Sequence, residues 1–167
     1  NVTQQTGKGW TQINSSQDEG LGKATGWGQA QYTGICWTGT NWLVSATYTY
    51  GFNIMSSPDG LNWTIRLSGG SMEDVVYSSE LDQALALGYQ YQGVGPIAVS
   101  NDGGITWNSS LPSVPLKSWT DAAYGNGAWV AVGTEPGGGS MELIIRSTNG
   151  EDWAQFNTPG SYNKIAF

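Results

Sequence analysis

The chain has 167 residues and a net charge of −7, from 6 Lys and Arg against 13 Asp and Glu, and it contains no His. So few cations argue against a nucleic-acid partner and against docking on anionic lipid, and no apolar run approaches the about 18 residues of a membrane span. Without His there is no Ser-His or Cys-His nucleophile and no imidazole metal ligand, so we expect neither a cofactor nor a metal.

The composition favours an all-β fold. The chain is rich in Gly, with 25 residues, and carries 9 Trp and 8 Tyr. Its apolar runs are short and are punctuated by Gly, Asn, Ser and Pro, and few segments have the i, i+3, i+4 spacing of a helix.

The N-terminal part is expected to hold one strand without its sheet. Residues 1–13 contain a degenerate turn, Thr6-Gly7-Lys8-Gly9, followed by the extended segment Trp10–Ile13. Residues 14–34 form a long polar, Gly-rich connection, and connections of this length are commonly functional or mobile. We expect this connection to fill an incomplete unit or to reach a neighbouring chain.

Three similar units follow, over residues 35–67, 71–110 and 118–158. Residues 122–134 align without a gap on residues 35–47, and residues 75–88 repeat the pattern with a two-residue insertion. Late in each unit comes a turn of Ser, one residue, Asp or Asn, then Gly and Trp. The defining residues are Ser57, Asp59, Gly60 and Trp63; Ser100, Asp102, Gly104, Thr106 and Trp107; and Ser147, Asn149, Gly150 and Trp153.

The segment Ser100–Trp107 resembles, at every defined position, the Asp-box of the sialidase-repeat (BNR) family. The resemblance implies a β-propeller of four-stranded antiparallel blades, with the box as the hairpin between the third and fourth strands. Recurrence at roughly 45 residues is also the period of propeller blades. We therefore predict a single β-propeller domain, or propeller segment, of three complete blades.

The end of the chain predicts a first strand of a further unit. Residues 161–167 align without a gap on residues 118–124 and also match residues 71–77. Three blades and two terminal strands are too few for the usual ring of 4–8 blades. Three interpretations stay open: two chains close a ring, successive chains share the split blade, or the sequence is a piece of a longer protein. Because an unpaired edge and an open blade face attract another chain, we expect a homo-oligomer or filament through the terminal strands and blade faces.

The resemblance also raises the hypothesis of an enzyme. Sialidases of this family are expected to use three Arg on the substrate carboxylate, a Tyr–Glu nucleophile pair and an Asp acid. Only Arg66 and Arg146 are present, so the Arg triad cannot be built from one chain. A different glycosidase needs only two carboxylates at a set separation, for which Asp74 and Asp121 are the candidates, with Glu73 beside the first. The alternative is that these are turn or edge carboxylates exposed to water.

One face of the predicted blades collects aromatic residues between Asn, Gln and Ser, a composition suited to sugars. These residues are Tyr48, Tyr50, Tyr89, Tyr91, Trp27 and Trp119. The alternative is that the rings fill the seams between blades, and Trp119 aligns with Met72 and Tyr162, a repeated large apolar position. The Trp residues that recur with the units are predicted to be structural: Trp42, Trp63, Trp107, Trp129 and Trp153.

The remaining signals concern the compartment. Cys36 is the single cysteine, so no internal disulfide can form, and we interpret it as a small buried hydrophobe. Four sequons start at Asn1, Asn14, Asn62 and Asn108. Together with an N-terminus that is not Met, they lead us to expect a secreted glycoprotein.

Two hypotheses of function remain at this point. The first is a non-catalytic extracellular module that is structural or self-assembling, with lectin-like carbohydrate binding. The second is a glycosidase-like half-site whose carboxylate pair is completed by another chain or by further sequence.

Overall fold

The computed structural model describes residues 31–47, 53–69, 71–89, 97–110, 118–134, 142–157 and Ile165. Within these residues there are twelve strands and no helix, which confirms the all-β prediction. It follows that they contain no helix long and apolar enough to cross a membrane.

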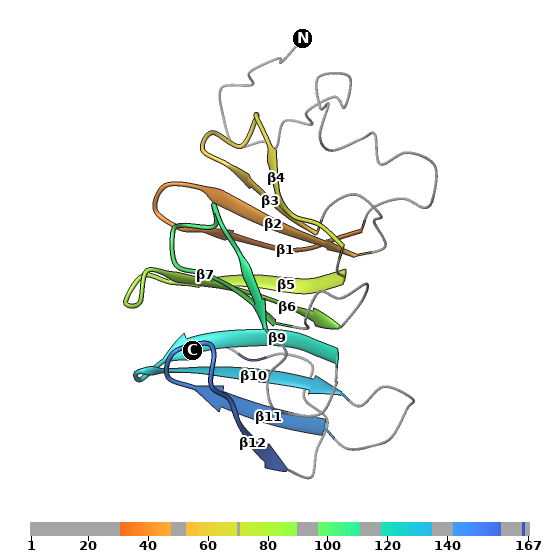
Figure 1. The fold of residues 1–167 in the computed structure, drawn as a ribbon, viewed down its shortest axis with the longest axis vertical. Helices are drawn as coiled ribbons and strands as arrows, with labels where there is room; N and C mark the ends of the chain where they lie inside the picture. The colour runs from red at the N-terminus through yellow and green to blue at the C-terminus, as the bar shows by residue number, and fades with distance from the viewer. Residues whose placement is uncertain are drawn as a thin grey trace, which may run out of the picture.

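The strands form three antiparallel sheets of four strands, each in sequential order (Figure 1). Sheet 1 consists of β1 (Gln31–Trp37), β2 (Trp42–Thr47), β3 (Ile54–Ser57) and β4 (Thr64–Leu67). Sheet 2 consists of β5 (Ser71–Ser78), β6 (Gln83–Tyr89), β7 (Ile97–Ser100) and β8 (Asn108–Ser110). Sheet 3 consists of β9 (Ser118–Gly125), β10 (Ala128–Thr134), β11 (Glu142–Ser147) and β12 (Ala154–Asn157).

The pairing register repeats from sheet to sheet. Trp37 pairs with Trp42 at the first turn of sheet 1, and Tyr124 pairs with Trp129 at the same place in sheet 3. Between the first and second strands, each sheet also has one irregularity of register, which falls at Tyr32/Gly34, Met72/Asp74 and Val132/Gly133. A repeated bulge gives the three sheets the same local bend and twist.

Strand β1 is longer than the sequence indicated. It begins at Gln31, within the residues expected to belong to the connection 14–34. The added residues are held by the neighbouring sheet, because the hydroxyl of Thr33 donates to the backbone oxygen of Met72 at 2.8 Å. This contact lies far away in sequence, so local polarity could not reveal it.

The sheets stack face to face, with sheet 2 in the middle (Figure 1). Strand β5 packs against β1 and β2, and β9 packs against β5 and β6. Gly34 allows the closest approach of β1 and β5, because a Cβ there would lie 2.3 Å from Asp74 Oδ1 and 2.8 Å from Val75 N. The described sheets form an open stack and do not close into a ring.

Apolar side chains fill both interfaces of the stack. Sheets 1 and 2 share a buried cluster of Leu43, Ile54, Met72, Val75, Ala84, Ala86 and Ala98. Sheets 2 and 3 share a larger one of Leu85, Leu87, Ile97, Val99, Trp119, Ala122, Trp129, Ala131, Leu143, Ile145 and Trp153. Burying apolar area at about 25 cal/mol per Å² is the main force that holds such sheets together.

Candidate functional site

In each sheet, one polar side chain organises the turn between the third and fourth strands. In sheet 1, Asp59 Oδ1 accepts the backbone N–H groups of Leu61 and Asn62, both at 2.8 Å. Ser57 donates its hydroxyl to the same oxygen at 3.0 Å and accepts the N–H of Gly60 at 2.9 Å. The backbone hydrogen bonds to Asn62 and Leu61 are the main causes that hold the pKa of Asp59 well below its usual value.

The turn of sheet 2 repeats this arrangement. Asp102 accepts the backbone N–H groups of Ile105 and Thr106 and the hydroxyls of Thr106 and Ser100. Burial acts to raise the pKa of Asp102, but the hydrogen bonds from Thr106, Ser100 and Ile105 outweigh it and the pKa is lowered. Both carboxylates are therefore engaged within their turns.

The turn of sheet 3 exchanges the acid and the amide. Asn149 Oδ1 accepts the N–H groups of Glu151 and Asp152 at 3.0 and 2.9 Å, as Asp59 does in sheet 1. The Asn149 amide then donates to Asp152 Oδ2 at 2.9 Å, whereas in sheet 1 the Asn62 amide donates to Asp59 Oδ2 at 2.8 Å. The same hydrogen bond is kept with donor and acceptor reversed.

The turns also join neighbouring sheets. In each turn the Trp indole N–H donates to the backbone oxygen of the turn glycine; for Trp153 and Gly150 the distance is 3.0 Å. A Cβ on Gly104 would lie 2.2 Å from Leu43 of sheet 1, and one on Gly150 would lie 2.6 Å from Gln83 of sheet 2. Each of these two turns therefore packs directly on the preceding sheet.

The two candidate catalytic carboxylates occupy equivalent places on β5 and β9. Asp121 is 6% exposed, and its Oδ2 accepts the backbone N–H of Ile165 at 2.8 Å. Asp74 is half-buried against Gly34 and accepts the N–H of Val75 at 2.8 Å. Burial raises the pKa of the neighbouring Glu73. Both carboxylates thus accept a backbone N–H group, Asp74 from the next residue of its own strand and Asp121 from Ile165, far along the chain.

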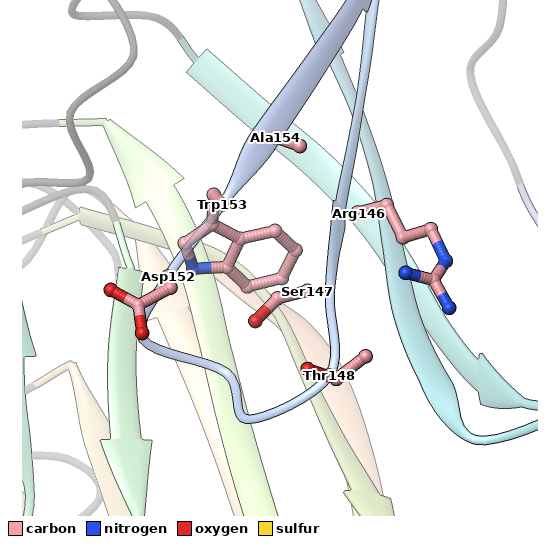
Figure 2. A pocket seen from close by; sticks show the side chains of 6 residues that line it. All are labelled: Arg146, Ser147, Thr148, Asp152, Trp153 and Ala154. Atoms are coloured by element: carbon pink, nitrogen blue, oxygen red, sulfur yellow. The ribbon is translucent and has the colours of Figure 1, made fainter.

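A hollow of about 330 Å³ lies beside the turn of sheet 3 (Figure 2). It is lined by Arg146, Ser147, Thr148, Asp152, Trp153 and Ala154. Figure 2 shows the Arg146 guanidinium pointing away from the Trp153 indole, with Asp152 on the other side of the turn. The hollow contains neither Asp74 nor Asp121, so it does not bring together the predicted carboxylate pair.

Most of the predicted sugar surface lies outside the described residues. This holds for Trp27, Tyr48, Tyr50 and Tyr91 and for the side chain of Tyr89. Trp119 is described and is 0% exposed within the cluster between sheets 2 and 3, so its ring is not available to a ligand. A repeated apolar position at the start of a first strand is a core position, which explains its burial.

An aromatic surface that the sequence did not reveal lies on the outer side of sheet 1. It presents Tyr32, Ile35, Trp37, Trp42 and Ile65, each at least 39% exposed. The ring centroids of Trp37 and Trp42 are 5.1 Å apart with planes at 50°. Trp42 was expected to be structural because it recurs as Trp129, but Trp129 is 0% exposed while Trp42 is 39% exposed. The difference arises because Trp129 faces sheet 2, whereas Trp42 faces outward.

The corresponding pair in sheet 3 shows what such rings contact when a sheet precedes them. Tyr124 and Trp129 have ring centroids 5.1 Å apart in an edge-on arrangement. Trp129 donates its indole N–H to Gln83 Oε1 at 2.7 Å, and Tyr124 donates its hydroxyl to Glu80 at 3.1 Å. Glu80 lies in the turn between β5 and β6, and Gln83 is the first residue of β6. This aromatic pair therefore serves as a contact between sheets.

Two smaller expectations concern Cys36 and the sequons. Cys36 is half-buried, and burial, followed by the charge of Asp74, raises the pKa of its thiol to about 12. Asn62 and Asn108 are exposed, as a glycan requires, although the Asn62 amide already donates to Asp59. Asn1 and Asn14 lie outside the described residues.

The described residues hold no group of three or more Cys, Asp or Glu that could bind a metal.

Comparisons with known proteins give no family. No protein-family model matches the chain, and no curated protein matches its sequence.

Proposed function

We propose that the chain is a segment of a β-propeller of Asp-box blades, and that it serves as a non-catalytic, self-assembling structural module. The repeated register of the three sheets supports this proposal, as does the repeated hydrogen-bonding of their turns. A series of blades that differ only in detail is typical of propellers.

The contact of Ile165 supports a continuing series of blades. Gly34 of β1 approaches Val75 N of the next sheet, and Asp121 of β9 accepts the N–H of Ile165. Gly34 and Asp121 have the same register position, and in the sequence alignment Ile165 corresponds to Val75 and Ala122. The contact of Ile165 with Asp121 therefore supports a further blade in the series.

The observation that carries self-assembly is the exposed apolar side of sheet 1. Apolar patches of this kind on a monomer commonly mark interaction sites. The experiment is light scattering after size exclusion, together with sedimentation at several micromolar concentrations. We expect a mass that is a multiple of the chain mass and increases with concentration; a single monomer mass throughout would refute self-assembly.

We favour a non-catalytic role because the candidate carboxylates have structural partners. Asp121 is buried and bonded to Ile165, and Asp74 lies in the contact of β1 with β5. Carbohydrate binding remains part of the proposal through the aromatic residues of the sequence. A glycan array beside a hydrolysis assay tests both: turnover that Asp74→Asn or Asp121→Asn abolishes would favour the glycosidase instead.

We further propose that the module is extracellular, on the basis of its sequons. The intact mass of the native protein before and after enzymatic deglycosylation tests this. A loss of glycan mass, mapped to the exposed Asn108, would support the proposal, and an unmodified native chain would remove its basis.

A further inference from the structure

The interface between sheets 2 and 3 shows how one sheet of this chain packs on the next. We call the side of a sheet that faces the following sheet its forward face, and the opposite side its back face. The forward face of sheet 2 presents Leu85, Leu87, Ile97 and Val99. The back face of sheet 3 meets it with Ala122, Trp129, Ala131, Ile145 and Trp153.

The back face of sheet 1 repeats this second set of positions. Ile35 pairs with Val44 as Ala122 pairs with Ala131, and Trp42 corresponds to Trp129. Yet Ile35 is 63% exposed where Ala122 is 4% exposed, and Trp42 is 39% exposed where Trp129 is 0% exposed. By register Val44, Ala46 and Met55 also lie on this face, and they are 9%, 0% and 0% exposed. The open part of the back face is therefore the part that carries Ile35, Trp37, Trp42 and Ile65, and its counterparts are buried elsewhere in the molecule.

The forward face of sheet 3 repeats three of the four positions of the first set. By register, Val130, Val132 and Ile144 take the places of Leu85, Leu87 and Ile97, whereas the exposed Arg146 takes the place of Val99. Val132 is 2% exposed, so the open part of this face lies toward its outer strand. Phe156 pairs with Ile144 and is 49% exposed. Ile165 extends this end of the stack through its bond to Asp121. The two faces lie at opposite ends of the stack (Figure 1).

We propose that the back face of sheet 1 docks on the C-terminal end of the stack in a second copy of this chain. That end consists of the forward face of sheet 3 together with Ile165. The inference rests on the proposed self-assembly and specifies its surface and its direction. The contact is heterologous, because two different surfaces meet. It gives a ring if the rotation that relates one copy to the next closes on itself, and a filament if it does not.

Few charged side chains lie near the two faces. Among the described residues of sheet 1 they are Asp59 in the turn and Arg66, which donates to Ser56 and so belongs to the forward face with Leu43. On the forward face of sheet 3, Asp121 accepts the N–H of Ile165, and Arg146, which pairs with Val130, is exposed. The contact must therefore leave Arg146 in water or pair it, because an unpaired buried charge is costly.

The direction follows from the way in which sheets 2 and 3 already pack. There the back face of one sheet meets the forward face of the sheet before it, and among the described sheets no back face packs on another back face. The hydrogen bonds of Trp129 and Tyr124 to Gln83 and Glu80 do not decide the direction, because by register Ala128 has the place of Gln83 in sheet 3. A second copy at the end of the stack therefore repeats a pairing of faces that the chain already uses.

The test uses single charge substitutions on exposed residues of the full chain. Ile35→Glu places a carboxylate in the back face of sheet 1, and Phe156→Glu places one in the forward face of sheet 3. Each is expected to weaken self-association about a hundredfold or more, because a buried unpaired carboxylate is costly. The matched control is Ile105→Glu, at an exposed isoleucine in the turn of sheet 2, which should assemble as the original chain does.

Mixing the two variants tests the direction. A chain with Ile35→Glu keeps an intact forward face, and a chain with Phe156→Glu keeps an intact back face. In a head-to-tail assembly the mixture forms a one-to-one complex, although each variant alone is monomeric. Circular dichroism shows whether each variant is folded, and Ile65→Glu replaces Ile35→Glu if the latter is not.

The outcomes separate this inference from the proposed function. If the original chain stays monomeric, self-assembly itself is refuted, and this inference with it. If the original chain assembles but folded Ile35→Glu and Ile65→Glu assemble equally well, the back face of sheet 1 is not the surface. If the mixture stays monomeric while each variant alone blocks assembly, the head-to-tail direction is wrong and the proposed function stands.

Discussion

Trp129 of sheet 3 donates its indole N–H to Gln83 of sheet 2 at 2.7 Å, in the buried interface of the two sheets. The amide of Gln83 in turn donates to the Asn101 side chain at 2.9 Å and to the Asn149 backbone oxygen at 3.0 Å. One side chain, 6% exposed, thus connects β6 with the turn of its own sheet and with the turn of the next. Because all its polar atoms are used, it selects one alignment of the two sheets.

Replacing Gln83 with Ala should destabilise the protein. The change leaves Trp129 Nε1 and the Asn149 backbone oxygen without their partner, which we expect to lower the free energy of unfolding by about 2 kcal/mol or more. Urea unfolding followed by Trp fluorescence measures the loss. The control is Asn41→Ala at the same place in sheet 1, where the amide donates to Thr40 at the surface; its effect should stay within about 0.5 kcal/mol. Equal effects at both positions would contradict the assigned role of Gln83.

Replacing Gly104 with Ala should be much worse than replacing Gly39. Both have a positive φ, of 87° and 92°, so both substitutions carry the cost of a left-handed backbone, about 1–2 kcal/mol. A Cβ on Gly104 would also lie 2.2 Å from Leu43, whereas one on Gly39 meets nothing within 4 Å. We expect the added clash to cost about 1–3 kcal/mol more, as overpacking does. Chemical unfolding of the two variants measures the difference, and equal losses would show that the turn does not pack on sheet 1.

Cys36 should react slowly in the folded protein. A thiol with a pKa of about 12 is almost wholly protonated near neutral pH, and the thiolate is the nucleophile. Alkylation by iodoacetamide at mildly alkaline pH should therefore be far slower in the native state than in denaturant. Asp74→Asn removes only the second cause of the shift and leaves the burial, so it should accelerate the reaction little. Equal native and denatured rates would contradict the burial of this side chain.

The turns were predictable because their chemistry is local. Ser100, Asp102 and Gly104 bond within a few residues of one another, so the sequence pattern alone indicated the hairpin. The exposure of Trp42 was not predictable, because it depends on whether another sheet lies against its ring. Trp119 shows the same limit, since a large aromatic residue suits a core and a sugar site equally. Only the packing of β9 on sheet 2 decides in favour of the core.

Acid should weaken the fold through the turn carboxylates. The pKa values of Asp59 and Asp102 are lowered in the folded state, below an unfolded value of about 3.9. Their contribution to stability is therefore complete above about pH 5 and is lost as the pH falls through the folded pKa values. Urea unfolding at a series of acidic pH values measures the decline. In Asp102→Asn one of these groups no longer titrates, so the decline should be shallower; an unchanged slope would show that Asp102 does not contribute.

Exchanging the two polar residues of the first turn should recreate the third. In Asn62→Asp the new carboxylate faces Asp59, and the two like charges should lower the free energy of unfolding at neutral pH. In Asp59→Asn the loss should be small, because the Asn62 amide can turn over and present its oxygen. The double variant places an amide at 59 and a carboxylate at 62, the order that Asn149 and Asp152 already use.

The double variant should therefore recover most of what Asn62→Asp loses. In a double-mutant cycle we expect a favourable coupling of about 1 kcal/mol, typical of neighbours in one hydrogen-bonded network. The protein is produced without glycosylation, because Asn62→Asp also removes a sequon. The reverse exchange at Asn149 and Asp152 is the matched control, for which Asn149→Asp should be the damaging single change. Strictly additive effects in both turns would mean that the hydrogen bond between the two side chains contributes nothing, and that the backbone N–H groups alone hold each turn.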